Sequence, residues 1–167
     1  EMRSKIYILS CLAILMLASC STQKNTWASR SFHQTKTKYN IHYNGQIAFG
    51  EGLEAINQAH EDDYSAILPL YSVSNHEAAK ASASHMNRTI EKCRKCIKLH
   101  SIKERPKKIN HKKRRSNPKY KAWLEQEEFN NQMGNAWLLL GKAEFHKGDF
   151  LGSVSTFNYI ARHYAHD

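Results

Sequence analysis

Three side chains that could bind a metal ion lie close together in the sequence, at Cys93, Cys96 and His100. Offsets of three and seven residues place all three on one face of a helix, where two thiolates and an imidazole could ligate zinc. A structural zinc site needs a fourth ligand, and the sequence has no second cysteine pair with ligand spacing. The alternative is that the cysteines belong to the apolar stripe of that helix, and we expect no metal.

The other titratable residues offer material for acid–base chemistry without a recognisable arrangement. They are four scattered histidines and one acidic run, namely His33, His42, His60, His76 and 61–63. None of them accompanies a nucleophile, a glycine-rich loop or a pair of metal ligands at a spacing that enzymes use. The sequence therefore predicts a protein that is not an enzyme and has no cofactor.

The most highly charged segment is the basic stretch 103–119, which contains nine lysines or arginines and two prolines. This composition cannot bury enough apolar surface to offset the entropy of ordering, so it predicts a flexible loop. The charge could attract anionic lipid headgroups or an acidic protein, or serve solubility alone. Because interleaved aromatic residues for base stacking are lacking, we expect no nucleic-acid partner.

The first residues have the pattern of an export signal. Arg3 and Lys5 precede an apolar run over 6–18, which is shorter than the ~20 residues that a transmembrane helix needs. The end of this run overlaps the motif LASC at 17–20, whose last residue is Cys20. The motif resembles the lipobox of bacterial lipoproteins. The resemblance implies that residues 1–19 are a signal peptide. It also implies that Cys20 carries the lipid, including palmitate, that anchors the mature chain in a membrane.

The part of the chain after the export signal predicts an all-α fold. Glycine and proline are few, which argues against a turn-rich β fold, and apolar residues recur at intervals of three and four. We expect a tether or a frayed approach helix at 20–38, an N-terminal helical region at 39–102, the basic flexible loop at 103–119 and a further helical region at 120–167.

The sharpest pattern is in residues 134–167, whose length of 34 is the period of the tetratricopeptide repeat. The residues that define it are Trp137, Leu140, Gly141, Ala143, Gly148, Phe150, Phe157 and Ile160. Small residues allow two helices to approach closely, glycine reverses the chain, and the large apolar residues fill the space between the helices. Glu144 and Ser153 depart from the pattern, which favours an aromatic residue and an alanine at these positions.

The repeat pattern also predicts what surrounds it. A single repeat cannot bury both of its faces, and about three are needed for stability. We therefore expect helical neighbours in a repeat solenoid, and an exposed apolar face at the C-terminal end of this chain.

Three segments together resemble the N-terminal part of the PorW/SprE lipoproteins of Bacteroidota. They are the YNIHYNG stretch that follows Cys20, the segment DDYSAILPLY, and the repeat AWLLLGKAEFHKGDFLGSVSTFNYIARHY. These are longer tetratricopeptide-repeat proteins of the type IX secretion system, and in gliding species they also support motility. The resemblance implies a lipid-anchored protein on the periplasmic face of the outer membrane. It would be a scaffold between the translocon and the ring of accessory proteins, with no catalytic role.

Two other classes of lipoprotein remain as alternatives, because both also use helical repeats. A SusD-type nutrient-uptake protein would bind glycans through exposed aromatic platforms. A lipoprotein of outer-membrane-protein assembly would bind other components of that machinery.

Overall fold

Helices make up most of the part of the chain that the structure describes. The computed structural model describes residues 24–61, 64–65, 67 and 76–164. In chain order the elements are α2 (Trp27–Tyr39), the π-helix η1 (Asn40–Gly45), α3 (Gln46–Ala59), α4 (His76–His100), α5 (His111–Ser116), α6 (Pro118–Glu125), α7 (Met133–Lys147) and α8 (Phe150–His163). The predicted all-α class is confirmed for these residues, among which no β-strand occurs.

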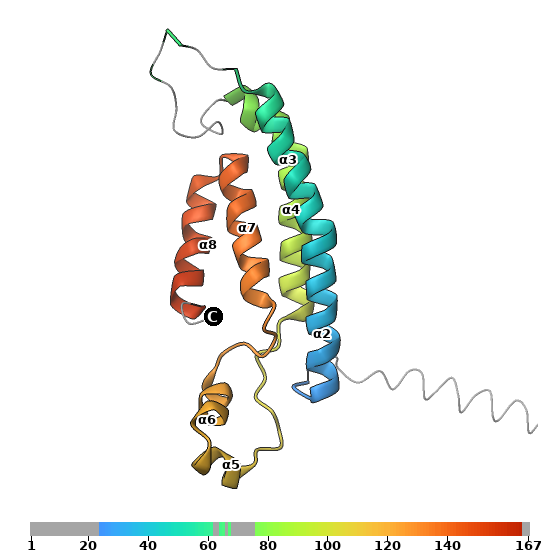
Figure 1. Cartoon of the computed structure of the whole chain (residues 1–167), viewed down its shortest axis with the longest axis vertical. Helices are drawn as coiled ribbons and strands as arrows, with labels where there is room; N and C mark the ends of the chain where they lie inside the picture. Colours follow the sequence, from blue (N-terminus) through green and yellow to red (C-terminus); the bar gives the residue numbers. More distant parts are fainter. Residues whose placement is uncertain (1–23, 62–63, 66, 68–75, 165–167) are drawn as a thin grey trace, which may run out of the picture.

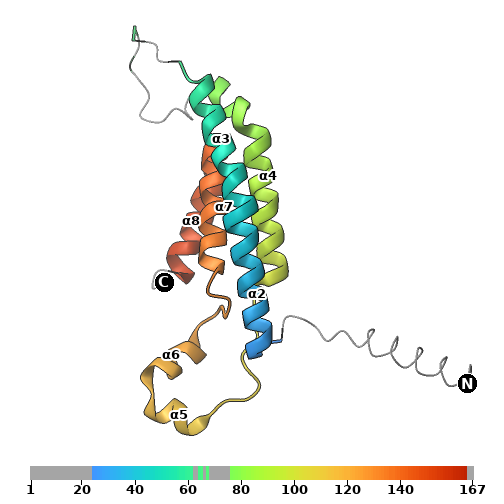
Figure 2. The same cartoon turned by 45° about the vertical axis from the view of Figure 1, so that its right-hand side comes forward.

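The long helices lie side by side, as Figures 1 and 2 show. α2, η1 and α3 continue one another along one side of α4, which runs back in the opposite direction. α7 packs mainly against α4 and touches α3 and η1 along a narrower strip, while α8 packs against α7. α5 and α6 stand apart from this stack, below the start of α2 in both views.

The apolar core lies where α4 meets the helices on its two sides. α4 contributes a stripe of buried residues at intervals of three and four, formed by Met86, Ile90, Cys93 and Cys96. Gly52 lets α3 approach this stripe closely, since a Cβ at that position would lie 2.6 Å from Met86 Cε. Buried residues from η1, α3 and α7 complete the core: Ile41, Ile56, Met133, Ala136, Leu139, Leu140 and Ala143.

Of the tether and the approach helix predicted for 20–38, the structure has a helix in the described part, because α2 begins at residue 27. Thr26 caps the helix and its hydroxyl accepts a backbone hydrogen bond of 3.2 Å from the first turn. Two buried polar side chains, His33 and Thr37, hold α2 in place. Thr37 Oγ1 accepts a hydrogen bond of 2.8 Å from Asn130. Since these anchors are polar, hydrophobic periodicity gave no signal for this helix.

The motif Asn40–Gly45 is a π-helical turn inside an otherwise continuous helix. The Gln46 backbone N–H donates to the carbonyl of Ile41, five residues earlier, which is the hydrogen bond that defines a π turn. Ile41 is buried in the core. Gly45 lies against α7, where a Cβ would come within 2.9 Å of Leu139 Cδ2. The turn therefore places two consecutive core contacts four residues apart.

The predicted flexible loop at 103–119 is also corrected, because it contains α5 and the start of α6. The side chains of Asn110 and Asn117 cap these short helices and accept backbone hydrogen bonds of 2.9 and 3.0 Å. The segment is closed at its base by a 2.9 Å hydrogen bond from the Phe129 N–H to the Ile102 carbonyl. α5 buries no residue. Its order therefore depends on the local caps and not on the burial of apolar side chains.

Candidate functional site

Residues 134–164 of the predicted repeat form most of the α7–α8 hairpin, which reverses direction in a two-residue turn. Gly148 ends α7 with a left-handed φ of 88°, a conformation that favours glycine. Asp149 caps α8, and its Oδ1 accepts a hydrogen bond of 3.0 Å from the Gly152 N–H. α8 therefore returns directly along α7 (Figure 1).

Close packing within the hairpin depends on Gly141. A Cβ at this position would lie 2.9 Å from Cε1 of Phe157, which is closer than carbon atoms normally approach. Ser153, one of the two departures from the repeat pattern, is buried on the facing side of α8. Its hydroxyl donates a 3.1 Å hydrogen bond to the Gly141 carbonyl. The serine therefore occupies the place of an alanine without leaving its hydroxyl unsatisfied.

The remaining residues that define the pattern range from buried to exposed. Leu140 and Ala143 are buried in the core that α7 shares with α4. Trp137 is partly buried and packs against the same core. Ile160 is half-buried on α8, while Phe150 is exposed at the start of α8. The hairpin thus directs some of these residues inwards and leaves others at its outer surface.

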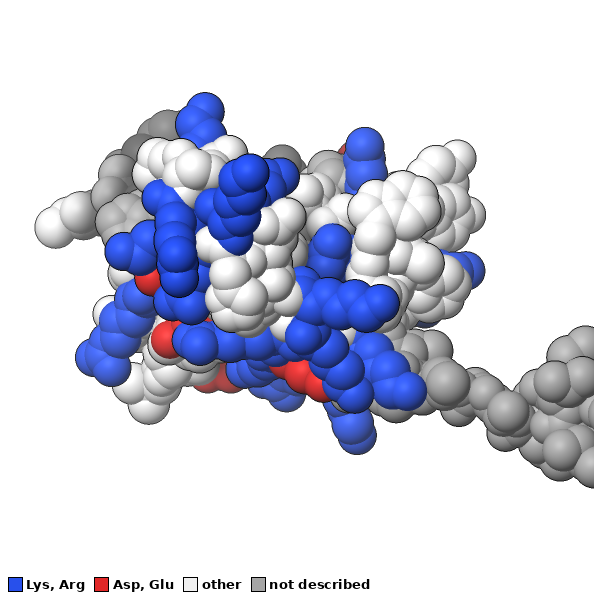
Figure 3. Space-filling model, turned by 90° about the horizontal axis from the view of Figure 1, so that it is seen from below, with Lys and Arg blue, Asp and Glu red and all other residues white. Residues whose placement is uncertain are grey.

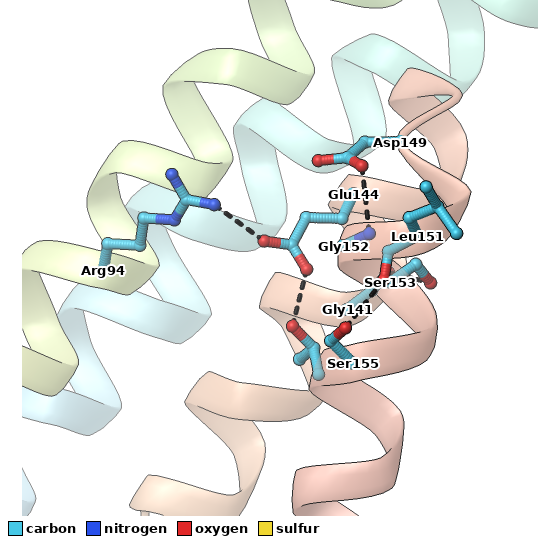
Figure 4. A network of polar contacts seen from close by, with 9 residues as sticks. Arg94, Gly141, Glu144, Asp149, Leu151, Gly152, Ser153 and Ser155 are labelled. Atoms are coloured by element: carbon cyan, nitrogen blue, oxygen red, sulfur yellow. Dashed lines mark hydrogen bonds and ion pairs between the residues drawn. The ribbon is translucent and has the colours of Figure 1, made fainter.

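Glu144, the second departure from the pattern, lies at the centre of a polar network between three helices (Figure 4). Its side chain is only 3% exposed. Oε1 accepts a hydrogen bond of 2.9 Å from Arg94 Nη2 on α4. Oε2 accepts one of 2.6 Å from Thr156 Oγ1 on α8. Sequence reasoning noticed Glu144 as an exception but identified neither donor.

The outer face of α8 exposes a set of apolar side chains, which we call the α8 face. Leu151 is 85% exposed and Val154 is 57% exposed, and Phe150 and Phe157 lie beside them with large parts of their rings uncovered. Ser153 and Thr156 occupy the opposite side of the helix and are buried. No other helix of the described residues covers the α8 face, because α8 packs chiefly on α7.

The three candidate metal ligands do not form a ligand set. Cys93 and Cys96 are buried in the stripe of α4. Burial, with a smaller contribution from Cys96 and Glu144, raises the pKa of the Cys93 thiol to about 12. His100 Nδ1 lies 2.9 Å from Nδ1 of His33. Among the described residues, no group of three or more His, Cys, Asp or Glu residues is placed to hold a metal ion.

A strongly basic surface covers the end of the molecule formed by the start of α2, α5 and α6, and we call it the basic end. It consists of Lys24, Arg30 and the lysines and arginines of 103–121. Viewed from below, Lys and Arg side chains dominate this end, with uncharged groups between them (Figure 3). A pocket of about 540 Å³ opens there, lined in part by Trp27, Arg30, Lys107, Lys108, Tyr120 and Trp123.

The predicted signal peptide and the predicted lipid-attachment residue Cys20 lie outside the described residues. Within the described part of the chain, none of the helices has both the length and the apolar character needed to span a bilayer. Comparison of the chain with protein-family models and with curated proteins gives no match.

Proposed function

We propose that this chain is a non-catalytic scaffold whose α8 face receives a helical partner, as the next repeat or a binding protein does in a tetratricopeptide solenoid. The observation that carries the proposal is the exposure of Leu151 and Val154, at 85% and 57%, beside two exposed phenylalanines. Contiguous apolar patches of this kind mark interaction sites on soluble domains. Burying one such side chain contributes about 1.5–3 kcal/mol, and several together offset the translational and rotational entropy that association costs.

The interior of the hairpin supports this role, because it holds α8 in place before a partner arrives. Gly141 packs directly under the ring of Phe157, and Glu144 links α8 to both α7 and α4. A surface that is already ordered loses less conformational entropy on binding than a mobile one. The partner therefore meets a helix whose orientation is fixed.

For the cellular setting, we propose the role that the family resemblance implies. The chain would be an outer-membrane lipoprotein of the type IX secretion system, anchored through Cys20 and facing the periplasm. It would bind translocon and ring components there, and in gliding species it would serve motility as well. The support for this setting is the YNIHYNG stretch, the repeat in 134–167 and the lipobox-like LASC motif.

The experiment is a tagged pull-down from detergent-solubilised envelopes of the native bacterium, with the full chain as bait and mass spectrometry as the readout. We expect enrichment of secretion translocon and ring proteins. The double variant Leu151→Asp/Val154→Asp should lose them. The control variant Ile47→Asp/Leu99→Asp places the same two charges at exposed apolar residues of α3 and α4 and should retain them. Loss in both variants, or retention in both, would contradict the assignment to the α8 face.

The pull-down also separates the scaffold from the two alternative lipoprotein classes. Enrichment of the barrel-assembly machinery would indicate the assembly role. A glycan-binding role is favoured by one observation, the exposed Tyr39 and Tyr43 rings, which stack at 5.4 Å with an interplanar angle of 7°. Binding of soluble oligosaccharides that is lost in Tyr43→Ala would favour the nutrient-uptake role over the scaffold.

A further inference from the structure

We propose that the basic end is a second binding surface, which docks on the phosphate-bearing headgroups of an anionic membrane. Residues 103–121 contain ten lysines and arginines and a single acidic residue, Glu104. A lysine or arginine close to an anionic bilayer strengthens binding by roughly fivefold, so ten of them provide ample attraction. This inference goes beyond the scaffold function, which depends on the α8 face.

Among the described residues, no ion pair neutralises the lysines and arginines that residues 103–121 contribute to the basic end. The ion pairs of the described residues are His85–Glu51, Arg94–Glu144 and His163–Glu127. None of them involves a lysine or arginine of residues 103–121. These side chains are therefore available to external anions, and their mutual repulsion would be relieved when phosphates come close.

A framework of aromatic rings holds part of this charge in a defined place. The Arg30 guanidinium lies 5.0 Å from the centroid of the Trp123 ring. Trp123 stacks on Tyr120 with 5.6 Å between ring centroids, and the Lys113 ammonium lies 5.1 Å from the Tyr120 ring. Two rings are thus enclosed by two cations, an arrangement that cation–π attraction stabilises.

The position of Trp27 points to a lipid surface as the occupant. This residue is 78% exposed and lines the pocket of the basic end together with Lys24 and Lys107. An exposed tryptophan among lysines is typical of the membrane interface, where the indole lies at headgroup depth and the cations meet phosphates.

The proposed lipid anchor also lies close to this surface along the chain. Lys24 lies four residues after Cys20, and four residues span at most about 14 Å. Under the anchoring proposed above, the basic end is therefore the part of the described structure nearest to the bilayer. Docking there would fix the orientation of the long helices relative to the membrane and direct the α8 face sideways towards partners.

The test is flotation of the full chain with vesicles of phosphatidylcholine alone and with vesicles that also contain phosphatidylglycerol. The apolar run at 6–18 contributes to both, so the difference between the two vesicle types measures the basic end. We expect preference for the anionic vesicles, lost at high salt because screening shortens the range of the attraction.

Two variants with the same change in charge make the test specific. The first neutralises exposed residues of the basic end: Lys107→Gln, Lys108→Gln, Lys112→Gln and Arg115→Gln. The second neutralises four exposed residues elsewhere: Lys80→Gln, Lys92→Gln, Lys95→Gln and Lys142→Gln. At roughly fivefold for each residue, we expect the first variant to lose roughly 600-fold in partitioning to anionic vesicles and the second to lose little. Circular dichroism verifies that both retain their helices.

Several outcomes would overturn the membrane proposal. They are equal binding to the two vesicle types, equal losses in the two variants, and tighter binding to polyglutamate than to anionic vesicles. None of them would affect the scaffold proposal, because the pull-down depends on Leu151 and Val154 at a different part of the molecule. Conversely, a failed pull-down with intact vesicle preference would leave membrane docking in place.

Discussion

Breaking the Arg94–Glu144–Thr156 network one residue at a time should destabilise the chain more than replacing the whole network by apolar residues. Thr156→Val removes the 2.6 Å hydrogen bond to Oε2 of a carboxylate whose side chain is 3% exposed. A hydrogen bond to a charged group contributes about 1.5–3 kcal/mol, so we expect a loss of about 2 kcal/mol in the free energy of unfolding.

Removal of the cation should cost a similar amount. Breaking a fully buried ion pair costs about 3–5 kcal/mol, because the remaining charge has no partner. The Arg94 side chain is 64% exposed, so water can replace part of its contribution. For Arg94→Leu we therefore expect about 2 kcal/mol.

The triple variant Arg94→Leu/Glu144→Leu/Thr156→Val removes the desolvated carboxylate together with both donors. Apolar replacement of a buried ionic network is often neutral, so we expect a stability within about 1 kcal/mol of the original chain. The free energies come from urea unfolding followed by circular dichroism. Ser155→Ala, next to Thr156 on the exposed side, is the control and should change stability by less than about 0.5 kcal/mol. A triple variant that loses the sum of the single effects would refute the reasoning.

Three further results are expected from the same structure. Gly141→Ala should lose about 1–3 kcal/mol in urea unfolding because its Cβ would lie 2.9 Å from a ring carbon, whereas Gly50→Ala, with nothing within 4 Å, should gain about 0.5–1 kcal/mol. Burial lowers the pKa of His100 and His146 in the folded chain. Below about pH 6.5 the unfolded chain therefore binds more protons than the folded one, and the melting temperature should fall. A melting temperature that stays constant between neutral and mildly acidic pH would contradict this. The pKa of about 12 at Cys93 predicts that iodoacetamide labels this thiol at mildly alkaline pH only after unfolding, as peptide mass spectrometry can show.

The α7–α8 hairpin could be predicted from sequence because its signals are local. Gly148 and Asp149 lie next to each other and set the turn, and the apolar residues on either side recur at helical intervals. The exposure of Leu151 also follows from sequence, since a single hairpin cannot cover both of its sides. Whether further hairpins extend it into a solenoid is part of the proposal above.

The parts that sequence did not predict depend on contacts between distant residues. α2 is held by Thr37 and His33, whose partners Asn130 and His100 lie 93 and 67 positions away along the chain. Glu144 likewise depends on Arg94, which is 50 positions distant. In the sequence, a polar residue that has a buried partner cannot be told from a polar residue that faces water. The two cases differ only in the folded chain, where the packing of α4 against its neighbours brings the distant partners together.

The π turn at Asn40–Gly45 explains how one helix serves both ends of the molecule. Buried residues recur at positions 33, 37, 41 and 45, each four residues after the last. In a regular α-helix with 3.6 residues per turn, each such step rotates the buried face by about 40°, so three steps would rotate it by about 120° and away from α4. A π turn contains more residues per turn and reverses this drift. The same helix can therefore contact His100 near the basic end and Leu139 in the hairpin, and a deletion within the turn would uncouple these two contacts.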